Sequence, residues 1–122
     1  MRNLIVVAAL LLPIPASATT FDVITTRLKP ECSFATYRAI TKDFNDSWGK
    51  SHGYTASLAL PVHSATSGVI VWMGTTKSAE AFGKAWDTWR DALADPASVP
   101  ARLQARFDAC GTQISRESYD SY

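Results

Sequence analysis

The 122-residue sequence predicts an α+β fold, in which one antiparallel four-stranded sheet carries two helices on one face. The first observation is the order of the segments, which follow one another as strand, helix, strand, strand, helix, strand. The second is that only a turn-rich stretch joins the two middle strands, as in a hairpin. The third is the position of the two cysteines, which this order brings to one edge of the sheet.

The first half of the chain supplies a strand and an aromatic helix. Residues 21–29 are rich in β-favouring residues and stop at Pro30, which predicts the first strand. Ser33 is a candidate N-cap for the next helix, and the segment 49–53, bracketed by two glycines, is expected to end it. The large apolar residues of this helix form one stripe, which comprises Phe34, Tyr37, Ile40, Phe44 and Trp48.

The middle of the chain has the pattern of a hairpin. Residues 54–62 alternate between apolar side chains and small or weakly polar ones, which predicts a strand with one apolar face. Pro61 is typical of an edge strand. After the turn-rich stretch 63–68, residues 69–75 are apolar on both faces, and we expect them nearer the centre of the sheet.

The second half supplies the remaining helix and strand. Ser78 is a candidate N-cap for a helix that Asp95-Pro96 interrupts. A further helical stretch follows and ends at Cys110, and residues 112–119 are expected to form the last strand. The apolar stripe of the second helix comprises Phe82, Ala85, Trp86, Trp89 and Leu93.

This order of elements is that of a ferredoxin-like βαββαβ fold. Together with the strand VIVWMGT (69–75), which leads into the aromatic-rich helix SAEAFGKAWDTWR (78–90), it resembles the dimeric α+β barrel superfamily over most of residues 20–120. That superfamily includes antibiotic-biosynthesis-type monooxygenases and NIPSNAP-like and EthD-like proteins. The resemblance implies a homodimer whose sheets pack face to face, with a cleft between sheet and helices in each subunit.

The N-terminus has the three parts of a secretory signal peptide: Arg2, a short apolar run and the ending Ala16-Ser17-Ala18. The apolar run, residues 4–16, is shorter than the roughly 20 residues that a membrane-spanning helix needs. We therefore expect cleavage near Ala18, a secreted or periplasmic product without a stable membrane anchor, and a single domain over residues 19–122.

Cys32 and Cys110 are the only cysteines, and both lie in the predicted mature chain. In an oxidising compartment a disulfide is the economical interpretation. A redox or metal pair is the alternative, although Cys-x-x-Cys spacing and neighbouring histidines are missing from the sequence. In the predicted topology Cys32 follows the first strand and Cys110 precedes the last, and these two strands are antiparallel neighbours.

The charges of the mature chain balance. The segment 1–18 carries one of the 12 Lys and Arg residues and none of the 11 Asp and Glu residues, which leaves 11 of each. A nucleic-acid or anionic-lipid partner would select for a basic surplus, so we expect neither. Sequence motifs of hydrolases, nucleotide-binding loops, and zinc and calcium sites are missing as well. We predict no metal and no cofactor, with haem as the alternative.

Aromatic residues are the first candidates for a binding site. Tyr54 and Trp72 on the sheet and Trp86 on the second helix could line an aromatic pocket; packing in the core is the alternative. If Val71 and its alternating neighbours face the helices, Trp72 faces the opposite side of the sheet. That side would then need a dimer partner or a ligand to cover it.

Charged candidates are fewer. His52 and His63 are either exposed loop residues or a haem ligand or general base at the mouth of the barrel. Arg27 and Arg116 are either solvated strand ends, or one of them faces an anionic group in the cleft. Asn45 begins an Asn-Asp-Ser glycosylation sequon within the predicted first helix.

Two functional hypotheses follow. The first is an exported, non-catalytic protein that binds a small apolar or aromatic molecule or a protein partner, since the sequence has no recognisable catalytic constellation. The alternative, which rests on the resemblance and on the Trp and His residues near the expected cleft, is a cofactor-independent monooxygenase or a haem-handling enzyme.

Overall fold

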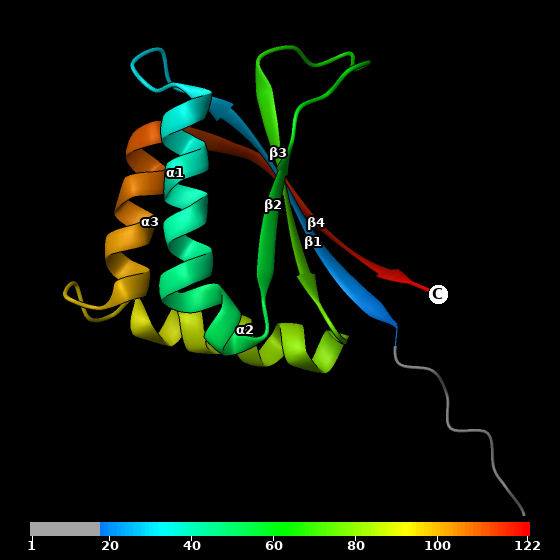
Figure 1. The fold of residues 1–122 in the computed structure, drawn as a ribbon, viewed down its shortest axis with the longest axis vertical. Coiled ribbons are helices and arrows are strands. Elements are labelled where there is room, and N and C mark those ends of the chain that lie inside the picture. The colour runs from blue at the N-terminus through cyan, green and yellow to red at the C-terminus, as the bar shows by residue number, and fades with distance from the viewer. Residues whose placement is uncertain (1–17) are drawn as a thin grey trace, which may run out of the picture.

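A computed structural model describes residues 18–122 (Figure 1). The predicted signal peptide lies outside these residues except for Ala18, so its cleavage stays a prediction. The elements are β1 (Thr19–Leu28), α1 (Phe34–Phe44), β2 (Thr55–Ala59), β3 (Val69–Thr76), α2 (Ala79–Ala92), α3 (Val99–Cys110) and β4 (Gly111–Ser121). One π-helical turn, η1 (Asn45–Gly49), and one 3-10 turn, η2 (Lys50–His52), extend α1 towards β2.

The four strands form one antiparallel sheet in the order β2-β3-β1-β4, with all the helices on one of its faces (Figure 1). The predicted ferredoxin-like α+β fold is therefore confirmed. Within residues 18–122, the further helical stretch that the sequence predicts after the Asp95-Pro96 break forms a third helix, α3, whose N-cap Ser98 accepts a hydrogen bond from the Ala101 N–H. Strand β2 is shorter than predicted and ends at Ala59, before Pro61.

The helices cover the face of the sheet that carries Asp22 and Thr26 of β1 and Ile70 and Trp72 of β3, all of them buried. The suggestion that Trp72 faces away from the helices was wrong. Strand β3 is apolar on both faces, so alternation could not show which set of side chains was covered. Among residues 18–122, no helix covers the opposite face (Figure 1).

A bulge in β4 sets which of its side chains point toward the helices. Thr25 pairs with Ser115, but Thr26 pairs with Gln113, so Ile114 has no partner on β1 and is 49% exposed. The extra residue reverses the alternation, so Gln113 and Arg116 both lie on the helix side. Arg116 thereby stands beside Ile24, on the neighbouring central strand β1.

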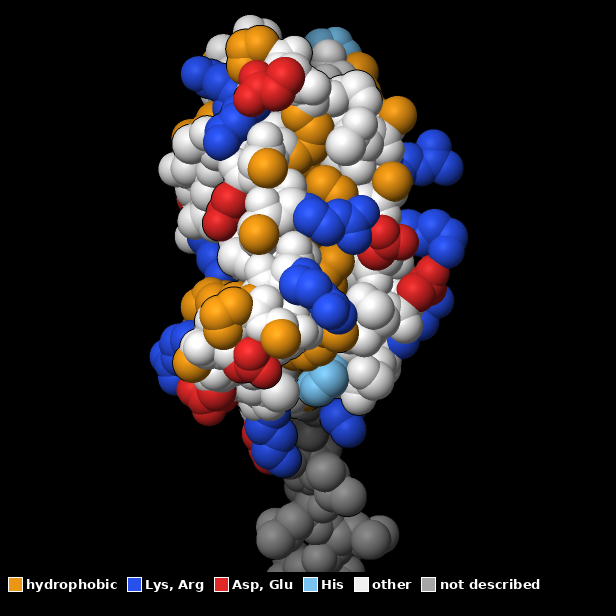
Figure 2. All heavy atoms as spheres, turned by 90° about the vertical axis from the view of Figure 1, so that its left-hand side faces the viewer, with side chains coloured by type: hydrophobic (Ala, Val, Ile, Leu, Met, Phe, Trp, Pro, Cys, Tyr) orange, Lys and Arg blue, Asp and Glu red, His pale blue; other side chains and the backbone are white. Residues whose placement is uncertain are grey.

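The helix-covered side of the molecule has mixed charge. Figure 2 shows basic and acidic side chains interspersed on it, and some of them pair, as Arg106 of α3 does with Asp43 of α1 at 2.7 Å. A nucleic-acid surface would instead gather basic residues in one stripe. Among residues 18–122, no helix is long and apolar enough to cross a membrane.

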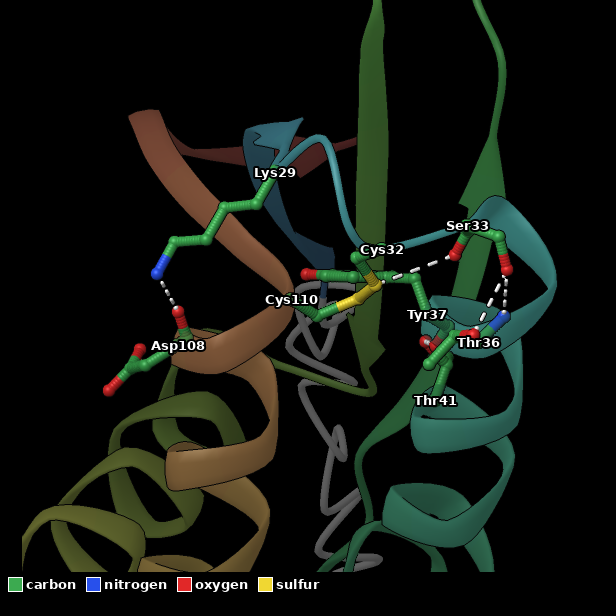
Figure 3. The surroundings of a disulfide bond; sticks show 8 residues. All are labelled: Lys29, Cys32, Ser33, Thr36, Tyr37, Thr41, Asp108 and Cys110. Carbon is green, nitrogen blue, oxygen red and sulfur yellow. Dashed lines mark hydrogen bonds between the residues drawn. A yellow bond between two sulfur atoms is a disulfide. The ribbon is translucent and has the colours of Figure 1, made fainter.

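The predicted disulfide joins Cys32, just after β1, to Cys110 at the end of α3, with 5.1 Å between their Cα atoms (Figure 3). Hydrogen bonds reinforce the junction: the Lys29 N–H donates to the Cys110 carbonyl at 2.9 Å, and Lys29 Nζ donates to the Asp108 carbonyl at 2.7 Å. The bond closes a loop over 78 positions and fixes the start of β4 against the end of β1.

We expect removal of this disulfide to lower the free energy of unfolding by about 2–5 kcal/mol, because the unfolded chain regains the freedom of a long loop. Urea denaturation of the oxidised protein, the reduced protein and the Cys32→Ala/Cys110→Ala variant measures the change. The reduced wild type controls for the packing that the alanines remove. Coincident urea midpoints for all three forms would contradict the prediction.

Candidate functional site

A cavity of about 500 Å³ lies between the helix side of the sheet and the three helices. Nearly half of its lining is aromatic, and the aromatic residues come from all three helices, η1, strand β3 and the position just before β2: Tyr37, Phe44, Trp48, Tyr54, Trp72, Phe82, Trp86, Trp89 and Phe107. Phe44 lies at the centre of this wall, with ring centroids 4.9–5.5 Å from those of four neighbouring aromatic residues. Edge and tilted contacts of this kind lock the rings of the wall against one another.

A buried ion pair lies in this otherwise aromatic cavity. Asp22, on β1, is 1% exposed, and Arg116 of β4 grips its carboxylate with two hydrogen bonds, Nε to Oδ1 at 2.8 Å and Nη2 to Oδ2 at 2.7 Å. Such a two-point contact is the strongest form of pairing between arginine and a carboxylate. The pair is buried on one side only, because the Arg116 side chain is 26% exposed.

Two aromatic residues complete the shell of the carboxylate. The Tyr54 hydroxyl donates to Asp22 Oδ2 at 2.7 Å and accepts a hydrogen bond from Trp72 Nε1 at 2.8 Å. Burial, and then the charge and hydrogen bond of Asp22, raise the pKa of Tyr54 far above its ordinary value, so the phenol stays protonated. The result is a continuous chain of donors, from Trp72 through Tyr54 to Asp22, which Arg116 meets from the other side.

Gly74 makes room for this network. It lies opposite Asp22 on the neighbouring strand, and a Cβ atom at this position would be only 1.8 Å from the Tyr54 hydroxyl oxygen. A strand glycine of this kind permits the close approach of another group. Strand β3 therefore needs a residue without a side chain at position 74, where the phenol of Tyr54 crosses the strand.

Trp86 covers the outer side of the ion pair. The Arg116 guanidinium carbon lies 4.0 Å from the centroid of the Trp86 ring, in a cation–π contact, and Trp86 itself is 36% exposed. Together the two side chains form part of the rim of the cavity between α2 and β4.

Of the predicted site residues, the structure brings Tyr54, Trp72 and Trp86 together around the cavity. His52 lies in η2 outside the lining, with its ring stacked on Trp48 at a centroid distance of 4.2 Å. His63 is exposed in the loop between β2 and β3. Arg27 is exposed at the end of β1, on the sheet face away from the helices.

The residue that the sequence analysis missed is Asp22. The sequence feature that could have identified it is an acidic residue within the predicted first strand, at a position that alternation places on the same side as buried residues. For Arg116 the sequence left two interpretations open, a solvated strand end or a partner of an anionic group in the cleft. The structure agrees with the second, and the anionic group is the carboxylate of Asp22.

Asn45 has a structural role. Its Nδ2 donates to the carbonyl of Ala56, and its Oδ1 accepts from the N–H of the same residue, both at 2.8 Å. The side chain therefore satisfies the outer backbone groups of Ala56 on the edge strand β2, as a neighbouring strand would. This use of the amide opposes its glycosylation in the folded chain.

No family model matches the chain, and no curated protein is similar to it in sequence. Solved structures are similar in fold. SnoaB, a cofactor-independent oxygenase from Streptomyces nogalater, is 13% identical with a TM-score of 0.56, and the match covers 87% of this chain and 95% of that one. The hydroxynitrile lyase of Passiflora edulis is 16% identical with a TM-score of 0.56, covering 88% and 96%. The chain thus has the fold of the dimeric α+β barrel proteins.

We expect Gly74→Ala to destabilise the protein by about 1–3 kcal/mol or more, because the added methyl group would push Tyr54 away from Asp22. Gly83→Ala is the matched control: within helix α2 its Cβ would meet nothing within 4 Å, so it should stabilise by roughly 0.5–1 kcal/mol. Urea midpoints measure both. A Gly74→Ala protein as stable as the wild type would refute the packing described for Tyr54.

Proposed function

We propose that the protein is an exported, non-catalytic binding protein for a small, flat aromatic molecule, which it holds in the cavity between sheet and helices. The observation that carries this proposal is the cavity itself, about 500 Å³ in volume, with many aromatic residues in its lining and a buried hydrogen-bond network around Asp22. Binding sites for small molecules commonly have volumes of about 300–1,000 Å³ and combine apolar walls with a few fixed polar groups.

The state of the polar groups supports binding rather than acid–base chemistry. Asp22 already accepts three hydrogen bonds from Arg116 and Tyr54. Three of the roughly four lone-pair sites of this carboxylate are therefore occupied, two of them by a charged partner, which weakens it as a general base. A general acid needs a pKa near the working pH. Burial holds the pKa of Tyr54 well above that range.

Cofactor-independent oxygenation is the second candidate, and the likeness to SnoaB favours it. The haem version is weaker, because neither His52 nor His63 is among the residues that line the cavity. Oxygen consumption with a panel of polycyclic phenols separates oxygenation from binding alone. If the wild type consumes oxygen with one of these phenols and variants of the cavity residues do not, the protein is an oxygenase and the non-catalytic proposal is wrong.

Narrowing the cavity should weaken ligand binding. We expect Ala85→Leu, at a buried lining position, to weaken binding of the neutral fluorescent probe N-phenyl-1-naphthylamine by at least about tenfold, because the larger side chain occupies part of the cavity that the probe needs. Ala105→Leu, on the exposed face of α3, is the control and should bind as the wild type does. Equal probe affinity in all three proteins, or none in the wild type, would count against the proposal.

The same proposal includes a homodimer. The open face of the sheet carries apolar side chains of three strands, which are half-buried or exposed in the single chain: Phe21, Val23, Val71, Met73 and Tyr119. Contiguous apolar surface on a small protein favours association, and the fold of dimeric α+β barrels supports the same arrangement. Export is supported by the intramolecular disulfide, which is typical of oxidising compartments.

Protein recovered from the medium or periplasm of its own host tests both parts. We expect mass spectrometry to show a chain that begins at Thr19, and sedimentation equilibrium to give the mass of a dimer. A chain that retains Met1 would refute export, and a monomer at micromolar concentration would refute dimerisation.

A further inference from the structure

We propose that Asp22 is a specificity-determining residue, which makes the cavity select uncharged aromatic molecules with an acceptor oxygen over the corresponding anions. This inference rests on the proposed function and names the class of ligand. It follows from two properties of the ion pair: Arg116 keeps free N–H groups, and Asp22 balances its positive charge.

Arg116 retains hydrogen-bond donors for a guest. A guanidinium has five N–H groups, and Arg116 uses one on Nε and one on Nη2 to hold Asp22. Within residues 18–122 its Nη1 has no hydrogen-bond partner, and Arg116 lines the cavity. The contact with Trp86 covers one face of the guanidinium, which helps to fix the plane in which the free N–H groups lie. A guest carbonyl oxygen in that plane can accept from them.

The charge of Arg116 is already balanced. Its partner carboxylate lies within 2.8 Å and is almost fully buried, so the field of the two groups largely cancels in the cavity. The other charged residue of the lining is a second acid, Asp108. An anionic guest on Arg116 would therefore lie close to Asp22 and lose its hydration without a net positive charge to replace it. A neutral acceptor avoids this penalty, since it needs only the donors.

Both halves of the selection depend on the fixed position of Asp22. Tyr54 and Arg116 together supply three hydrogen bonds to its carboxylate, and Trp72 holds Tyr54 in turn. The carboxylate thus cannot turn away from an incoming anion without losing these bonds. Discrimination of this kind depends on a repulsive group as much as on an attractive one.

Three probes with one ring system test the proposal: naphthalene, methyl 2-naphthoate and 2-naphthoate, measured by equilibrium dialysis against the mature protein. In the wild type we expect the ester to bind about tenfold more tightly than naphthalene, as a hydrogen bond to a charged donor would give. The carboxylate should bind more weakly than naphthalene. Asp22→Asn should raise the affinity for 2-naphthoate by at least about tenfold relative to the ester, because Arg116 then carries an unbalanced charge.

Asp91→Asn is the matched control, because it removes the same charge from an exposed position of α2 outside the cavity and should leave all three affinities unchanged. If Asp22→Asn fails to fold, the wild-type series decides, together with Arg116→Met, which should bind the ester no more tightly than naphthalene. Binding of 2-naphthoate as tightly as the ester in the wild type would overturn the inference. Failure of all three probes to bind would instead overturn the proposed function.

Discussion

The pairing of Asp22 with Arg116 is the constraint on which the rest of the site depends. A carboxylate in an aromatic core is tolerated only where its charge is paired and its lone pairs are hydrogen-bonded. The chain meets this demand from three strands and the residue before the fourth: β1 provides Asp22, β4 provides Arg116, β3 provides Trp72, and Tyr54 precedes β2. This arrangement places a fixed network of polar groups in the lining of the cavity.

The pair also explains how the last strand is held. Most residues of β4 are polar and exposed, so apolar burial contributes little to its attachment. Three cross-links tie it to β1 along its length: the disulfide beside its first residue, the ion pair at its middle, and a 2.7 Å hydrogen bond from Thr20 to Asp120 near its end. The bulge at Ile114 lies between the disulfide and the ion pair, and it makes the ion pair possible because it turns Arg116 toward the helices. Stability and site geometry thus depend on the same strand.

The sequence was sufficient for the fold because alternation and helical spacing report which faces are buried, and the positions of Cys32 and Cys110 checked the topology independently. The aromatic members of the site, Tyr54 and Trp72, were also found, since large apolar residues at regular spacing mark a core. Two features were out of reach. Strand β3 is apolar on both faces, so its orientation depends on tertiary packing, and the bulge that directs Arg116 toward Asp22 leaves no periodic signal in a polar strand.

A double-mutant cycle on the ion pair tests the account most directly. Asp22→Val and Arg116→Met should each lower the free energy of unfolding by about 3–5 kcal/mol, since each leaves one partner without its opposite charge. The double variant should be destabilised by clearly less than the sum of the two, by a coupling of up to about 3 kcal/mol. Urea denaturation of the four proteins gives these energies. Additive losses, with no coupling between the two positions, would contradict the central place that the pair has in this fold.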